Sequence, residues 1–208
     1  MMNKKTSNLI LDILNDLIPN PICELNYNNI YELTCAVCLS AQTLDKRVNE
    51  VTPSLFIKYP SIYDLKDAEF DDVYRIVKPL GFAANKANNL IGMANMVVNE
   101  YDGIIPSDMK ELIKLPGVGR KTASVILAVG FNIPAFPVDT HIKRMSHRLG
   151  YANEYDDVLT VEKKFTKYID KEQWNKAHHL FLLFGRYYCK AKKPECENCK
   201  LINFCKKK

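Results

Sequence analysis

The apolar residues of this chain recur at the spacing of an amphipathic α-helix. Prolines divide the chain into segments of helix length, at positions 53, 60, 79, 106, 116, 134, 137 and 194. The clearest apolar runs are Leu9, Ile10, Ile13, Leu14, Leu17 and Ile18, and Ala87, Leu90, Ile91, Ala94, Val97 and Tyr101. Strand-like alternation is hard to find, and the apolar residues 125–129 continue from a helical start. The pattern therefore predicts an all-α fold.

The breaks between these segments predict two helical domains that are not sequential halves of the chain. A central domain spans residues 22–132 and ends with a glycine-rich turn and its following helix. Pro134 and Pro137 then interrupt the chain, and the last third carries a group of cysteines. We expect residues 1–21 to join residues 133–208 in the second domain, although the first helix could pack on either.

A tight turn joins two helical segments within residues 109–131. The turn, residues 116–119, reads Pro-Gly-Val-Gly, which is too short for anything but a helix–hairpin–helix. Glycines allow positive φ and close approach of another backbone, and free N–H groups at a helix start bind phosphate. Because Arg120 and Lys121 follow, we interpret the turn as a contact to a DNA backbone. A helical corner without a ligand is the alternative.

Lys121 has two possible roles. Its position in the first turn of a helix opposes the helix dipole, and partial burial would add to this effect, so that the neutral amine becomes more accessible. A neutral amine can attack C1′ of a sugar and form a Schiff base. The simpler role is a phosphate contact, and the physical chemistry of the residue alone favours this role over that of a nucleophile.

The positive charge of the chain lies at its C-terminal end. The 208 residues include 29 Lys and Arg and 24 Asp and Glu, a net charge of +5. Residues 186–208 hold eight basic and two acidic residues, a net of +6, so the remaining residues sum to −1. Such a segment suits a polyanion, and a solubilising tail is the alternative. No apolar stretch approaches the roughly 18 residues of a membrane span, and the first residues lack signal-peptide features.

Seven cysteines, an odd number without a secretory signal, argue against a disulfide framework. Four of them lie within 17 residues, at Cys189, Cys196, Cys199 and Cys205. Four thiolates this close indicate either zinc or an iron–sulfur cluster, and the spacing by itself leaves the metal open. Cys35 and Cys38 lie in an apolar run that fits buried helix packing, and Cys23 is also expected to bind no metal.

Three motifs together resemble the endonuclease III family of helix–hairpin–helix DNA glycosylases. They are Leu-Pro-Gly-Val-Gly-Arg-Lys-Thr-Ala at 115–123, Val-Asp-Thr-His-Ile at 138–142 and Leu-Ser-Ala-Gln at 39–42. The resemblance runs from Leu9 to Cys205, with the motifs in the order of the family. It implies an all-α fold of two domains with the active site in the cleft between them.

The resemblance also implies a bifunctional DNA glycosylase and AP lyase of base-excision repair that removes oxidised pyrimidines. Lys121 matches the nucleophile that attacks C1′, and Asp139 matches the carboxylate that helps to deprotonate it and stabilises the cationic sugar. The Schiff base permits β-elimination of the 3′ phosphate, after the damaged base has been flipped out of the helix. Taken by itself, Asp139 is a common helix N-cap, and the two roles are compatible.

Further DNA contacts are implied by position. Gln42 matches the residue that fills the gap left by the flipped base, and Phe82 stands where the family commonly has a leucine wedge. His141 lies near the DNA in the family. The expected DNA-contact residues are Gln42, Phe82, Gly117, Gly119, Arg120, His141, Lys190, Lys192 and Lys193. The cysteine spacing matches that of the family and implies one [4Fe–4S] cluster on Cys189, Cys196, Cys199 and Cys205, which would fix the lysine-rich loop between the first two ligands.

The expected partner is double-stranded DNA with a damaged base or an abasic site. We expect a monomer without membrane association, in the cytoplasm and associated with the nucleoid through DNA. Two other functions stay open: a monofunctional glycosylase, and a non-catalytic DNA-binding module with a structural metal. Lys121 argues against the first, because those relatives lack a lysine at the hairpin position, and Asp139 in its family setting argues against the second.

Overall fold

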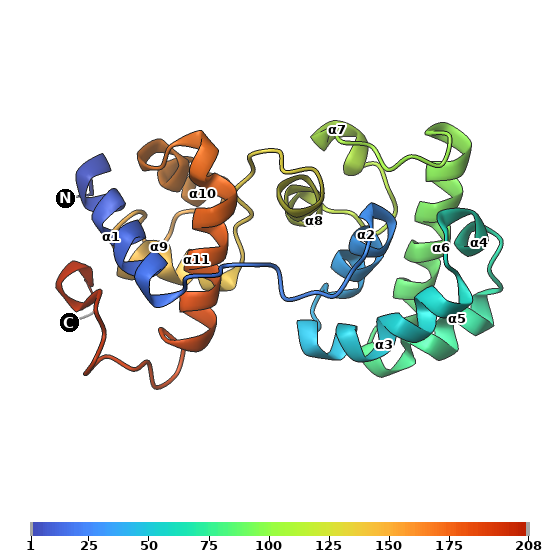
Figure 1. Cartoon of the computed structure of the whole chain (residues 1–208), viewed down its shortest axis with the longest axis horizontal. Helices are drawn as coiled ribbons and strands as arrows, with labels where there is room; N and C mark the ends of the chain where they lie inside the picture. Colours follow the sequence, from blue (N-terminus) through green and yellow to red (C-terminus); the bar gives the residue numbers. More distant parts are fainter. Residues whose placement is uncertain (1, 207–208) are drawn as a thin grey trace. The chain divides into compact units, whose positions relative to one another are not determined.

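A computed structural model describes residues 2–206 of the chain. In this part the protein has eleven α-helices and no β-strand, which confirms the all-α prediction (Figure 1). The chain divides into two compact units, one formed by Met1–Cys23 with Ile133–Lys208 and the other by Glu24–Asn132. None of the helices in the described part is both long enough and apolar enough to span a membrane.

The unit of residues 24–132 is built around its longest helix, α6. The buried residues of α6 recur every three or four positions, and α4 and α5 pack against it. In α2 every residue from Tyr31 to Leu39 is buried, which confirms the packing role predicted for Cys35 and Cys38. The helices of this unit are α2 (Ile30–Leu39), α3 (Asp45–Lys58), α4 (Ile62–Lys66), α5 (Phe70–Val77), α6 (Ala83–Glu100), α7 (Met109–Leu112) and α8 (Arg120–Val125).

The apolar segment 125–129 is helical, as expected, although it is not a regular α-helix. After α8 the chain continues as a π-helix over Ile126–Gly130. A Cβ added at Gly130 would lie 2.9 Å from Leu33 and 3.0 Å from Ile30, both in α2. The missing side chain of Gly130 therefore lets the end of this helix pack closely against α2.

The other unit has an aromatic core. The rings of Phe136, Tyr151, Phe165 and Phe181 contact one another, with centroids 4.2 to 5.6 Å apart. The buried hydroxyls of Ser7 and Tyr151 share a hydrogen bond of 2.8 Å, and α1 packs against α11. The first helix of the chain therefore belongs to this unit. Its helices are α1 (Lys4–Leu17), α9 (Thr140–Arg148), α10 (Val158–Tyr168) and α11 (Trp174–Tyr187).

Candidate active site

The glycine-rich turn lies between α7 and α8. Gly117 has φ +78°, and a Cβ added there would lie 2.8 Å from the Cβ of Asn89, so both conformation and space favour glycine. Gly119, which would also permit a positive φ, does not adopt one. Its φ of −84° and ψ of 173° are open to any residue, and an added Cβ would meet nothing within 4 Å. Gly119 instead leaves the backbone at the start of α8 uncovered.

Lys121 is the second residue of α8, and its side chain is exposed. Arg120, which precedes it, is exposed as well, and no side chain caps this helix start. The partial burial expected for Lys121 is therefore wrong for the free protein. Its amine is open to a reacting group, and exclusion of water from it has to come from a bound molecule.

Asp139 is the N-cap of α9, as expected for an aspartate at this position. Its Oδ1 accepts a hydrogen bond of 2.8 Å from the backbone N–H of Ile142, and the residue is half-buried. Among the described residues, no donor contacts its second carboxylate oxygen. The cap therefore fixes the carboxylate with one oxygen and leaves the other available for chemistry.

His141 follows in the first turn of α9 and is held by Arg144. Nη2 of Arg144 lies 3.2 Å from Nδ1 of His141 and donates to the backbone oxygen of Gly185 at 2.6 Å. Its Nε donates to the backbone oxygen of Cys189 at 3.1 Å. Because a guanidinium only donates, Nδ1 of His141 is the acceptor and a neutral ring carries its proton on Nε2. Arg144 thus joins the start of α9 to the first cysteine of the C-terminal group.

Arg148, one turn further along α9, binds the same segment. Its Nη1 donates to the sulfur of Cys189 at 3.0 Å and to the backbone oxygen of Lys190 at 2.9 Å. The sequence did not predict a role for Arg144 or Arg148. Their spacing of four residues places both on one face of α9, which is the only sequence signal that they share.

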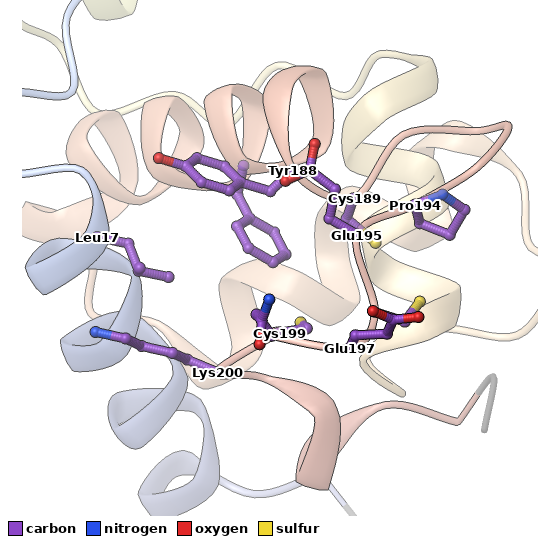
Figure 2. A pocket seen from close by; sticks show the side chains of 11 residues that line it. Leu17, Tyr188, Cys189, Pro194, Glu195, Glu197, Cys199 and Lys200 are labelled. Carbon is purple, nitrogen blue, oxygen red and sulfur yellow. The ribbon is translucent and has the colours of Figure 1, made fainter.

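The four C-terminal cysteines lie near one another. A cavity of about 490 Å³ is lined by Cys189, Cys196 and Cys199, together with Leu17, Phe184 and Tyr188 (Figure 2). The pKa of Cys199 is raised above its ordinary value, mainly by burial and further by the thiols of Cys189, Cys205 and Cys196. The thiolate forms of clustered cysteines repel one another, and a metal ion relieves that repulsion, so this group of cysteines suits a metal centre.

These residues fit a metal centre by their chemistry rather than by a closed arrangement of ligands. Within residues 2–206 no three His, Cys, Asp or Glu side chains are placed closely enough to hold an ion. The donor set nevertheless includes three thiols that line one cavity and a fourth, that of Cys205, which helps to raise the pKa of Cys199. A guanidinium also donates to the Cys189 sulfur. The lysine-rich loop beside them is exposed at Lys190, Lys192 and Lys193. Lys190 forms an ion pair of 3.0 Å with Glu195, so its charge is partly compensated.

Gln42 and Phe82 are exposed in two loops of the unit of residues 24–132. Phe82 is 67% exposed, which is unusual for a phenylalanine and excludes the core position that the residue type would favour. An exposed aromatic ring at the start of a long helix is well suited to contact a partner.

Comparisons with known proteins agree on one family. Residues 35–171 match the model of the HhH-GPD superfamily base excision DNA repair protein. The chain is 43% identical to an endonuclease III of Bacillus subtilis (strain 168), over 99% of this chain and 94% of the relative. It is 37% identical to an endonuclease III of Escherichia coli (strain K12), over 100% of this chain and 98% of the relative.

A solved structure described as a trapped endonuclease III–DNA covalent intermediate, in an estranged-adenine complex, matches with a TM-score of 0.95 and 43% identity. The match covers 99% of this chain and 97% of that one. With this identity over nearly the whole length of both chains, the protein belongs to the endonuclease III family, within the HhH-GPD superfamily of base excision DNA repair proteins.

Proposed function

We propose that the protein is a DNA glycosylase and AP lyase of base-excision repair that removes oxidised pyrimidines from double-stranded DNA and cuts the strand at the resulting abasic site. The observation that carries the proposal is the likeness, over 99% of the chain, to a structure described as a trapped covalent intermediate of endonuclease III and DNA. A covalent intermediate requires a nucleophile, and the exposed amine of Lys121 is suited to be one.

In the proposed reaction the neutral Nζ of Lys121 attacks C1′ of the flipped nucleotide. The bond between C1′ and the base breaks, and the base leaves with the electron pair and takes up a proton. The ionised carboxylate of Asp139 stabilises the cationic sugar as the base leaves, and it then accepts the proton that the amine releases. Ring opening breaks the C1′–O4′ bond: O4′ leaves with its electrons and takes up a proton, and the nitrogen lone pair forms the C=N bond of a protonated Schiff base.

Strand cleavage follows from the same intermediate. A proton leaves C2′, the electron pair forms a double bond between C2′ and C3′, and the 3′ phosphate departs with the electrons of the C3′–O bond. Water then hydrolyses the Schiff base and frees Lys121. The division of labour at Asp139 supports this scheme, because one oxygen holds the helix cap while the other is open to a proton.

DNA is held, in this proposal, by groups that do not react. The exposed turn at Gly117 and Gly119 receives a phosphate on its backbone, with Arg120 beside it. Lys192 and Lys193 add charge from the C-terminal loop, while Gln42 and Phe82 enter the base stack. His141 donates from Nε2 to the DNA, and Lys190 contributes less than its neighbours because of its ion pair with Glu195.

We further propose that Cys189, Cys196, Cys199 and Cys205 hold one [4Fe–4S] cluster. The cavity that three of them line and the guanidinium that donates to the Cys189 sulfur support this assignment. With four protein ligands the cluster has no open position, so its contribution is structural. The cysteine ligands would fix the loop that follows Cys189. Arg144 and Arg148 also hold this segment by donating to the backbone oxygens of Cys189 and Lys190.

Borohydride trapping tests the catalytic proposal. Wild-type protein and a duplex that contains an oxidised thymine are expected to give a covalent complex on reduction of the Schiff base. Lys121→Ala should abolish it, whereas Lys66→Ala, a change of one lysine in α4, should not. Base release without trapping would favour the monofunctional glycosylase, and binding without either reaction would favour the non-catalytic module.

Iron and sulfide analysis of purified protein tests the cluster. We expect four irons and four sulfides per chain, as the formula of the cluster requires. Protein that contains one zinc and no sulfide would overturn the assignment without affecting the trapping result.

A further inference from the structure

Gln42 and Phe82 share an unusual backbone conformation. Gln42, between α2 and α3, has φ +56°, and Phe82, at the N-cap of α6, has φ +49°. A positive φ is rare outside glycine and is costly for a bulky side chain, so it persists only where the surroundings enforce it. Both loop tips are exposed, and the enforcing contacts must therefore lie beneath them.

Lys86 lies beneath the first loop. From the first turn of α6 its Nζ donates to the backbone oxygen of Ala41 at 2.9 Å and to Oγ1 of Thr43 at 3.0 Å. These two residues flank Gln42 on either side. The ammonium group thus holds both ends of the three-residue segment that presents Gln42.

The second loop is joined to the same group. Oγ1 of Thr43, which accepts from Lys86, donates to the backbone oxygen of Leu80 at 2.9 Å, two residues before Phe82. The backbone N–H of Lys86 donates to the oxygen of Phe82 at 3.0 Å, and its Nζ lies 6.0 Å from the centre of the Phe82 ring. One lysine and one threonine therefore connect both loop tips.

Packing does not explain why this residue is a lysine. Lys86 is only 6% exposed, and among the described residues no carboxylate forms an ion pair with it. Burial lowers its pKa, the direction expected when water is removed from an ammonium group. An apolar side chain could occupy the same space without that desolvation cost. The charge is accounted for by the hydrogen bonds it makes to the loops, and an approaching polyanion would compensate it.

We propose that Lys86 is a positioning residue that, together with Thr43, locks the Gln42 and Phe82 loops into one preformed wedge before DNA binds. This inference rests on the proposed function, because it assumes that both side chains enter the base stack. It predicts that Lys86 serves the opening of the helix around a damaged base and not the chemistry at C1′.

The substitution Lys86→Met tests this prediction, because it keeps the length of the stem and removes the hydrogen bonds. Two duplex substrates are compared under single-turnover conditions, one with an oxidised thymine and one with a preformed abasic site. The abasic site has no base to unstack. Release of the damaged base should slow about tenfold or more, the loss expected when hydrogen bonds to a charged group are removed. Borohydride trapping on the abasic duplex should fall by less than about threefold.

Matched variants exclude simpler explanations. Lys66→Met removes one lysine from α4 of the same unit and should leave both rates unchanged. Thr43→Val removes the hydroxyl that joins the loops while keeping the shape of the side chain, and Thr43→Ser restores the hydroxyl. If Lys86→Met fails to fold, Thr43→Val and Thr43→Ser provide the same test. Thr43→Val should slow release of the damaged base more than trapping on the abasic duplex, and Thr43→Ser should slow neither. 2-Aminopurine fluorescence next to the lesion reports unstacking directly and should show slower opening with Val.

The outcomes separate this inference from the proposed function. Equal losses on both substrates would show that Lys86 only stabilises the fold, and unchanged rates on both would show that it positions nothing. Either result overturns the inference while wild-type trapping stands. If wild-type protein neither releases the base nor traps, the proposed function has failed instead.

Discussion

Two substitutions at Asp139 separate its structural role from its chemical role. Asparagine caps a helix about as well as aspartate, so Asp139→Asn gives up mainly the attraction between the charge and the helix dipole, about 0.3–1 kcal/mol. Asp139→Ala also leaves the N–H of Ile142, 2.8 Å from Oδ1, without its acceptor. This should cost about 1 kcal/mol more in the free energy of unfolding. Both variants lack the carboxylate, so base release should fall about 10²–10⁴-fold in both.

Urea unfolding followed by circular dichroism measures the stability, and single-turnover base release measures the chemistry. Asp157→Ala is the matched control, because Asp157 caps α10 in the same way by accepting from the N–H of Thr160 at 2.7 Å. It should lower stability and leave the rate unchanged. If Asp139→Asn kept wild-type activity, Asp139 would be a cap and nothing more. If the Asn and Ala variants were equally destabilised, the hydrogen bond to Ile142 would not matter to stability.

Three further predictions concern the turn, the core and the response to acid. Gly117→Ala should lower the free energy of unfolding by about 1–3 kcal/mol, because Gly117 has a positive φ. Gly119→Ala should fold normally but weaken DNA binding in a filter assay, and equal stability of the two variants would refute this. Phe165→Ala should destabilise the protein by about 3–5 kcal/mol in urea, since Phe165 is fully buried among aromatic rings, and a loss below 1 kcal/mol would contradict that packing. The pKa of Asp156 lies below its ordinary 3.8 because Lys164 donates to it at 2.5 Å, so its stabilising effect is present above pH 3.8 and lost as pH falls further. Lys164→Met should therefore lower the free energy of unfolding at pH 7, and the stability difference from wild type should narrow below pH 3.8. A difference that stayed constant with pH would refute the role of this ion pair.

The helical fold could be predicted because burial imposes its period on the sequence. The apolar run that begins at Leu9 follows α1 as far as its C-cap, Ile18, and the run that begins at Ala87 follows α6 as far as its C-cap, Tyr101. The helix starts were harder to locate, because polar residues precede the first buried position. α1 begins at Lys4, well before the apolar run, because the Asn3 side chain accepts from the N–H of Thr6 at 2.9 Å.

Residue type was a poor guide to two features of the hairpin. Gly117 and Gly119 both permit a positive φ, yet Gly119 does not adopt one, and the partial burial invoked for Lys121 is not found. Backbone angles in a short turn are shared among neighbours, and here Gly117 takes the positive φ for both glycines. Once Gly119 is extended, α8 begins at the surface, and Lys121 is exposed with it.

Several of the contacts that hold the site together share a property that hid them from the sequence. Lys86 binds the oxygen of Ala41, and Arg144 binds those of Gly185 and Cys189. All of these acceptors are main-chain carbonyls, which every residue possesses, so no residue type marks the receiving end. A pattern in the sequence can reveal a metal site or a catalytic pair because both ends carry distinctive side chains. A lysine or arginine that holds a loop through its backbone is distinctive at one end only, and it becomes recognisable when the structure shows that it is buried without a carboxylate.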